Sequence, residues 1–318
     1  MRNFVFIQQL RHIALLFSVF ASTCTWGLQA QTIEKDFNDY IQSIRENRYS
    51  DFPRHRVKPE NHAIILRLAS RYTTDTLVTV RATGYYMLKL VGLSSTDSKI
   101  RQQAVLRLLE GCKDPKSGNV SLCIDYLTQF NPSDFNPTAK DSMINLLQQK
   151  IYYFDEYVKL VGYVLADRAL PYLNKILQGS LSISRKERWA VQLAMARAGD
   201  EEQIKYIVQK ISNIEPNDAV VYHLVPDLIY TRQKRIFDQI IAWLNDDRQL
   251  CTSSNPDKEE KLVCGYRIME MLAPAIQKYP YQIDATGELL ADDYDKALEE
   301  IRYWFKNNPN YLINKNYY

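Results

Sequence analysis

The clearest internal repeat of the chain begins with Lys159–Leu177, KLVGYVLADRALPYLNKIL. It aligns with Gln192–Ile211, QLAMARAGDEEQIKYIVQKI, at an offset of 33 to 34 residues, and a weaker third copy runs from Leu224 to Leu244. Each copy combines a helix rich in small residues, a tight turn and a second helix with paired aliphatic side chains. Self-similarity at this period is typical of arrays in which one two-helix module stacks on the next. We therefore predict an all-α fold built from antiparallel helix pairs.

Helical spacing of apolar residues extends over most of the remaining chain. Ile204, Ile207, Val208 and Ile211 follow the i, i+3, i+4, i+7 pattern of one helix face. Short polar breaks recur about every 15 to 20 residues, which favours many short helices over one long coiled coil. Because two-residue alternation bounded by hairpin turns is lacking, the strand content should be close to nil.

A second internal match links Val80–Gly84, VRATG, to Ile100–Ala104, IRQQA, at an offset of twenty. Together with the Gly199-Asp200 turn and the start of a second helix at Ala169-Leu170-Pro171, these openings make the chain resemble HEAT repeats. The similarity is greatest to the short bacterial type that also occurs in phycobilisome-lyase-like proteins. It covers about residues 75–245 and departs from the family pattern at Leu165-Ala166-Asp167, which lacks the usual Gly, and over Lys113–Phe154.

The resemblance implies a right-handed α-α superhelix, an armadillo-type solenoid that binds a protein or peptide through one face. In such arrays the second helices usually line the concave side. This nominates six binding residues, which are Arg101, Arg107, Tyr172, Lys175, Lys205 and Tyr206. The expected organisation is a signal peptide over 1–30, N-terminal capping helices over 31–73, a repeat array over 74–250 and C-terminal capping helices over 251–318.

The first thirty residues have the layout of a secretory signal peptide. Arg2 and Arg11 precede an apolar run over Ile13–Ala21, and small residues lead to a cleavage site after Ala30. Nine apolar residues are fewer than the roughly 20 that span a bilayer, so an uncleaved anchor is the weaker interpretation. Lipid attachment at Cys24 is a second, less favoured alternative. We expect an exported protein of the periplasm or cell envelope.

The charge balance bears on the partner. Removing the two arginines of the signal peptide lowers Lys+Arg from 40 to 38 against 37 Asp+Glu, which leaves a net charge of +1. A nearly neutral chain has no global field for collecting phosphates, which argues against nucleic acid. No later apolar run is long enough to cross a membrane.

Four cysteines remain after the signal peptide, as two near-neighbour pairs. Because an exported chain meets an oxidising compartment, we predict the local bridges Cys112–Cys123 and Cys251–Cys264. The alternative is that these are free, buried thiols. Neither pair has the spacing of a zinc site.

Local signatures of catalysis are lacking. The sequence contains no GxSxG, HExxH, GxGxxG or GxxxxGK motif, and its acidic doublets point to different sides of their helices. We predict no catalytic residue, metal or cofactor. The 22 tyrosines are an unusual feature, and Tyr favours helix packing, interfaces and stacking on sugar rings. The leading hypothesis is a non-catalytic scaffold that binds a protein or peptide; the alternatives are a carbohydrate-binding or carbohydrate-active helical protein and a structural envelope component.

Overall fold

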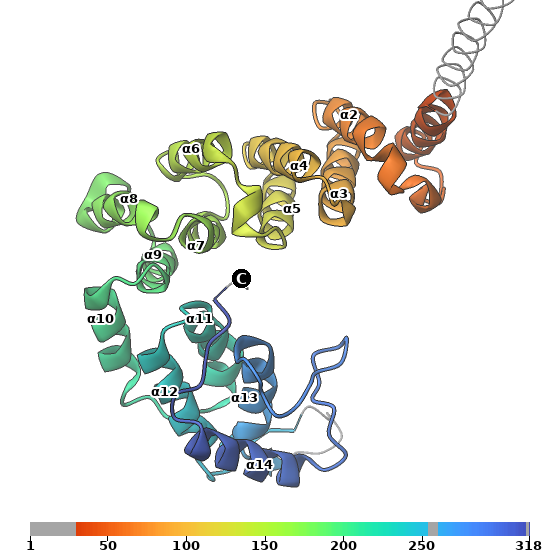
Figure 1. Ribbon diagram of the computed structural model, residues 1–318. Coiled ribbons are helices and arrows are strands. Elements are labelled where there is room, and N and C mark those ends of the chain that lie inside the picture. The colour runs from red at the N-terminus through yellow and green to blue at the C-terminus, as the bar shows by residue number, and fades with distance from the viewer. Residues whose placement is uncertain (1–29, 254–259, 316–317) are drawn as a thin grey trace, which may run out of the picture. The chain divides into compact units, whose positions relative to one another are not determined.

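The computed structural model describes residues 30–253, 260–315 and 318, so Cys24 and all but the last residue of the expected signal peptide lie outside the described residues. The described chain is mostly helical with almost no sheet, which confirms the all-α prediction (Figure 1). It divides into two compact units, one ending at Phe130 and the other beginning at Asn131. The division falls inside the predicted array over 74–250.

The first unit is a succession of helices in which each packs on the next. Its elements are a helix over residues 30–45, the 3₁₀ turns Arg54–Arg56 and Pro59–Asn61, and the helices α2 (His62–Tyr72), α3 (Val78–Ser94), α4 (Ser98–Gly111) and α5 (Ser117–Thr128). Helix α3 contacts α2, α4 and α5. A Cβ at Gly84 would lie 2.8 Å from the Thr73 nitrogen, so the close approach of α3 to the end of α2 requires glycine.

The offset of twenty in the sequence corresponds to a repeated local structure. Nη1 of Arg81 donates to the carbonyl oxygens six and five residues before it, at 2.9 and 3.1 Å. Nη1 of Arg101 makes the equivalent pair of hydrogen bonds, at 3.1 and 3.0 Å. Each arginine thereby ties the first turn of its helix to the preceding loop, which explains why the two helices open alike.

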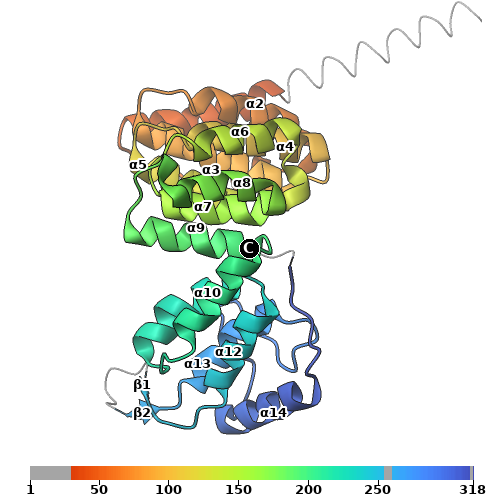
Figure 2. The same cartoon turned by 90° about the vertical axis from the view of Figure 1, so that its left-hand side faces the viewer.

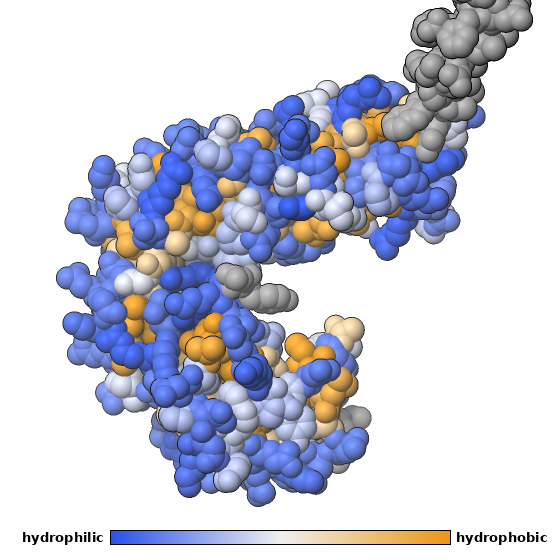
Figure 3. All heavy atoms as spheres, in the orientation of Figure 1, coloured by the Kyte–Doolittle hydropathy of each residue, from blue (hydrophilic) through white to orange (hydrophobic). Residues whose placement is uncertain are grey.

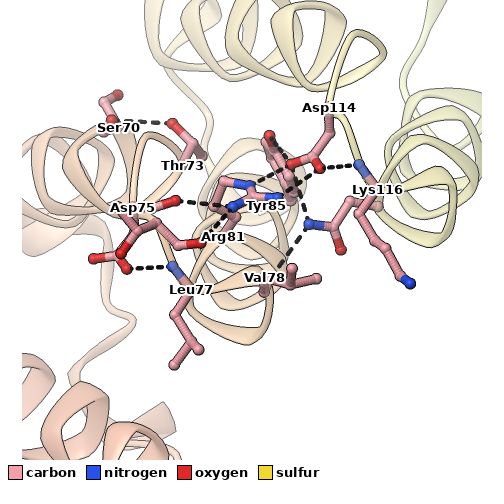
Figure 4. Close-up of polar contacts among 11 residues, drawn as sticks. Ser70, Thr73, Asp75, Leu77, Val78, Arg81, Tyr85, Asp114 and Lys116 are labelled. Atoms are coloured by element: carbon pink, nitrogen blue, oxygen red, sulfur yellow. Dashed lines mark hydrogen bonds and ion pairs between the residues drawn. The ribbon is translucent and has the colours of Figure 1, made fainter.

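Arg81 also anchors a buried polar network between α3 and the α4–α5 loop (Figure 4). Its Nε and Nη2 donate to the two carboxylate oxygens of Asp114 at 2.6 and 2.9 Å. The same carboxylate accepts from the Tyr85 hydroxyl, the Asn119 amide and the backbone nitrogen of Lys116. Burial alone would raise the pKa of Asp114, but these donors outweigh it and lower the pKa to about 2. The network is a structural clamp whose charges are matched and fully hydrogen-bonded.

The second unit contains two sets of helices. Its helices are α6 (Pro137–Leu147), α7 (Phe154–Leu165), α8 (Leu170–Lys175), α9 (Arg185–Arg197), α10 (Glu201–Ile211), α11 (Val225–Tyr230), α12 (Lys234–Leu244), α13 (Gly265–Leu272) and α14 (Tyr294–Asn307). Helices α7, α9, α11 and α13 each contact the next, while α10 packs on α9 and α12, and α12 packs on α11 and α13 (Figure 2, with α11 labelled in Figure 1). Single turns of 3₁₀ or π-helix fill several connections, namely Pro132–Asp134, Ala166–Ala169, Ile176–Ser180, Val220–Leu224 and Ala273–Ala275.

Within the described residues, strand pairing is confined to the C-terminal part. Strands β1 (Cys251–Thr252) and β2 (Lys261–Leu262) pair antiparallel, and single bridges join Ile276 to Ile313 and Ile283 to Leu289. The predicted near-absence of strands is thus confirmed for the described residues.

One of the two predicted disulfides is present. Cys251 and Cys264 are bridged, with their Cα atoms 5.1 Å apart. At the other pair the structure differs from the prediction, because Cys112 and Cys123 are both free and buried. The Cys112 thiol points back to the carbonyl of Leu108, whereas Cys123 lies against Gly111, where an added Cβ would come within 2.4 Å of its sulfur.

Hydrophilic residues cover most of the face shown in Figure 3, and hydrophobic residues appear on it as smaller patches. Among the helices of the described residues, none is both long enough and apolar enough to cross a membrane.

Candidate functional site

Three successive helices of the second unit bring Tyr163 of α7, Arg197 of α9 and Tyr230 of α11 together. The guanidinium carbon of Arg197 lies 4.9 Å from the ring centroid of Tyr163 and 4.8 Å from that of Tyr230. Both distances are within the range of a cation–π interaction, and two rings contact one cation. We call these residues, with the neighbouring Arg232, the tyrosine–arginine surface.

Small residues allow this convergence. An added Cβ at Gly162 would lie 2.8 Å from the Cβ of Ala194 and 2.5 Å from the Tyr230 hydroxyl. Helices α7 and α9 therefore approach closely only because neither carries a large side chain at this point. The Tyr230 hydroxyl donates to the carbonyl of Lys159 at 2.6 Å, and Nη1 of Arg197 donates to the carbonyl of Tyr230. These bonds fix the rings relative to the cation.

A second polar row lies on the same three helices. The Asp227 carboxylate of α11 accepts from the ammonium of Lys159 on α7 through one oxygen. Its other oxygen accepts from the indole nitrogen of Trp189 on α9 at 2.8 Å. The ammonium of Lys210, on α10, lies 4.8 Å from the Trp189 ring centroid. Charged groups and aromatic rings thus alternate across α7, α9 and α11.

The electrostatics of the surface favour binding over proton transfer. Burial lowers the pKa of Arg197, but arginine starts far above neutrality and keeps its charge. Burial raises the pKa of Tyr163, and it raises that of Tyr230 well above its ordinary value. Both hydroxyls are therefore neutral at physiological pH. The surface offers a fixed cation, aromatic rings and hydrogen-bond donors.

The chain places its own C-terminal segment on this surface. Nη2 of Arg197 donates to the carbonyl of Lys315 at 3.3 Å, and Nη2 of Arg232 donates to the oxygen of Tyr318 at 3.1 Å. The ring of Tyr318 lies edge-on to those of Tyr163 and Tyr230, with centroids 5.5 and 5.7 Å away. Burial raises the pKa of Tyr318. The segment contributes both main-chain acceptors and an aromatic side chain.

The six binding residues expected from the sequence lie elsewhere. Arg101 and Arg107 belong to α4, where Arg101 holds the preceding loop and Arg107 forms an exposed pair with Glu110 at 2.8 Å. In the second unit, Tyr172 and Lys175 are on α8, and Lys205 and Tyr206 are on α10. No hydrogen bond or ion pair among the described residues of this unit joins the α8 pair to the α10 pair.

A signal for the tyrosine–arginine surface is present in the sequence. Tyr163, Arg197 and Tyr230 are separated by 34 and 33 residues, which is the offset of the repeat. Equivalent positions of stacked modules lie side by side, so this spacing places the three side chains on adjacent helices. A search for aromatic and basic residues at the repeat spacing therefore finds these three residues, whereas choosing the second helix of each pair does not.

A cavity of about 460 Å³ opens between α12 and α14. Asp238 is the single acid among its lining residues, and it accepts from Lys234 and from the Tyr311 hydroxyl, at 2.8 and 2.9 Å. The cavity therefore lacks the two facing carboxylates of a glycosidase.

Two other acids, Glu270 and Asp295, lie near aromatic rings on α13 and α14. Glu270 accepts from the Tyr294 hydroxyl and from Arg267, and Asp295 accepts from the Tyr266 hydroxyl. In the part of the chain that the structure describes, no group of three or more His, Cys, Asp or Glu residues could hold a metal ion.

No protein-family model matches the chain, and neither a curated protein nor a solved structure does.

Proposed function

We infer that the chain is an exported, HEAT-like helical scaffold that binds a partner protein through the α7–α9–α11 face and does no chemistry there. In this proposal the helix pairs continue one another as a right-handed superhelix. The protein acts in the periplasm or cell envelope, where the Cys251–Cys264 bridge is stable.

One observation carries the proposal. Six side chains from three successive helices form a continuous set of cation–π contacts and hydrogen bonds on one face; they are Lys159, Tyr163, Trp189, Arg197, Asp227 and Tyr230. Trp, Tyr and Arg are the residues that dominate the binding energy of protein interfaces, because they combine large contact area with fixed hydrogen-bond geometry. Packing alone does not require two charged rows to run along the same helices.

The rigidity of the face supports binding further. Tyr163 and Tyr230 are 8% and 6% exposed, and the Gly162–Ala194 contact fixes the helices that carry them. A preorganised surface loses little side-chain entropy when a partner docks. The same rigidity suits recognition of a segment that has no structure of its own.

The test compares two faces of the same protein. A partner captured from the native envelope is identified by mass, purified and titrated calorimetrically against four variants. Lys159→Ala and Asp227→Asn alter the α7–α9–α11 face, whereas Lys205→Ala and Tyr206→Ala alter exposed positions of α10. We expect the first pair to weaken binding about tenfold or more, since each disrupts a charge-assisted contact, and the second pair to leave it within about twofold. Melting temperatures and circular dichroism establish that all four variants are folded.

If the α10 variants lose affinity while Lys159→Ala and Asp227→Asn keep it, the partner binds the second helices and the proposal that it binds the α7–α9–α11 face is wrong. Unchanged affinity in all four folded variants would remove the second unit from binding altogether.

A further inference from the structure

The C-terminal segment is bound in two parts that differ chemically. Its first part is held by main-chain hydrogen bonds and by two side chains, because the Asn314 amide donates to the carbonyl of Pro274 at 3.0 Å and the Tyr311 hydroxyl donates to Asp238. The Gln277 nitrogen donates to the carbonyl of Leu312, and the Asn314 nitrogen donates to the carbonyl of Ala275, both at 2.8 Å. Tyr311 anchors this part because its ring packs on Phe305 with centroids 5.3 Å apart.

The second part lies on the tyrosine–arginine surface, and side chains of that surface hold its described residues. Two arginine side chains take one main-chain oxygen each, from Lys315 and Tyr318. The only ring that this part places between Tyr163 and Tyr230, among its described residues, is that of Tyr318. Leu312, which precedes this part, is 63% exposed, whereas the ring of Tyr318 is partly buried against the helices of the second unit.

We propose that the tyrosine–arginine surface is a receptor for an extended peptide segment bearing an aromatic residue, and that the chain's own Lys315 and Tyr318 occupy it in the absence of partner. The proposal rests on the proposed function and names the chemistry of the segment that the partner presents. Arg197 and Arg232 donate to main-chain carbonyls of that segment, and its aromatic ring packs edge-on against Tyr163 and Tyr230.

Two features favour an extended aromatic segment over other occupants. The donors of the surface are guanidinium groups that bind main-chain oxygens, which every extended peptide carries at regular intervals. The rings offer edge-to-face contacts, which a flat aromatic side chain satisfies and an aliphatic one does not. The chain's own C-terminal segment meets both requirements. Because it is covalently attached, it competes with a partner's segment at an effective concentration in the millimolar range.

The experiment uses a fluorescein-labelled peptide of residues 311–318, YLINKNYY, and two proteins. One is the full-length chain; the other ends at Asn314, so that it retains Tyr311 and both main-chain hydrogen bonds but lacks the occupants of the surface. Fluorescence anisotropy gives Kd for each. A second peptide carries Tyr318→Ser, and a third protein combines the shortened end with Tyr163→Ala.

We expect the shortened protein to bind the peptide and the full-length protein to bind it at least tenfold more weakly, because the attached segment competes. The Tyr318→Ser peptide should lose about tenfold in affinity, and so should the Tyr163→Ala protein, since each removes aromatic contacts. Circular dichroism and melting temperature verify that the shortened protein is folded.

Equal binding to the full-length and shortened proteins, or binding that is indifferent to Tyr318→Ser, would overturn the proposal, as would no binding to a folded shortened protein. These outcomes are separable from failure of the proposed function. A partner that still depends on Lys159 and Asp227 while the peptide does not bind would leave the scaffold function standing and remove only the aromatic segment as its ligand.

Discussion

Replacing Asp114 by Asn should destabilise the first unit strongly, because it breaks the carboxylate clamp on Arg81. Both partners are largely buried, Arg81 at 9% and Asp114 at 6% exposure. The pKa of Asp114 falls from 3.8 to about 2, and that difference corresponds to about 2.4 kcal/mol favouring the ionised form in the folded protein. Asp114→Asn loses this and also leaves a buried guanidinium without its counter-charge, which costs about 3–5 kcal/mol in comparable pairs.

The pH dependence follows from the direction of the shift. A carboxyl whose pKa is depressed by folding stabilises the protein fully above its unfolded pKa of 3.8, and this contribution is lost as pH falls through about 2. The difference in unfolding free energy between wild type and Asp114→Asn should therefore be constant from pH 7 to about 5 and shrink between pH 4 and 2.

Urea unfolding followed by far-UV circular dichroism measures the free energy, and hydrogen exchange read by mass spectrometry localises the loss to α3, α4 and α5. Glu110→Gln is the matched control, because it removes an ion pair with Arg107 that lies within α4. The Glu110 side chain is 64% exposed, so its loss should lower the unfolding free energy by at most about 0.5 kcal/mol. An Asp114→Asn protein within about 0.5 kcal/mol of wild type, or a deficit that does not change with pH, would refute the reasoning.

Two further predictions concern close packing and the free thiols. Gly162→Ala should destabilise the second unit by about 1–3 kcal/mol, because the added methyl group would come within 3 Å of α9. The control Gly118→Ala has open space around the added methyl group, so it should be neutral or stabilising by up to about 1 kcal/mol. Thermal unfolding compares the two variants, and equal melting temperatures would contradict the packing argument. Iodoacetamide at pH 8 should label neither Cys112 nor Cys123 until urea unfolds the protein, since both are buried and burial raises the pKa of Cys112 to about 12. Rapid labelling of the folded protein, read by intact mass, would show that these thiols are accessible.

Much of the fold is predictable from local sequence, because helix ends and helix openings depend on nearby residues. One of the short polar breaks separates α4 from α5, and the matching openings at Arg81 and Arg101 make the same hydrogen bonds. The division after Phe130 depends on long-range packing, which the internal repeats do not encode. A single continuous array over 74–250 stays a prediction.

The candidate site was harder to predict because the repeat gives equivalent positions but not the layer that carries binding groups. The resemblance to HEAT repeats nominates binding residues on the second helices, Tyr206 among them. The repeat offset instead links Tyr163, Arg197 and Tyr230, the three side chains that lie together in the structure. Likewise, Cys112 and Cys123 are closer in sequence than the bridged pair, but pairing depends on the direction of each thiol, which spacing does not determine.

Photo-crosslinking from the two helix layers of the second unit tests whether a partner binds the α7–α9–α11 face. A benzophenone amino acid replaces Lys186, whose exposed side chain on α9 pairs with Asp155 of α7, or Lys175 on α8. The partner is then identified by mass after irradiation of the native envelope. We expect a crosslinked partner peptide at position 186 and none at position 175; crosslinks only at position 175, in folded protein, would contradict binding through the α7–α9–α11 face.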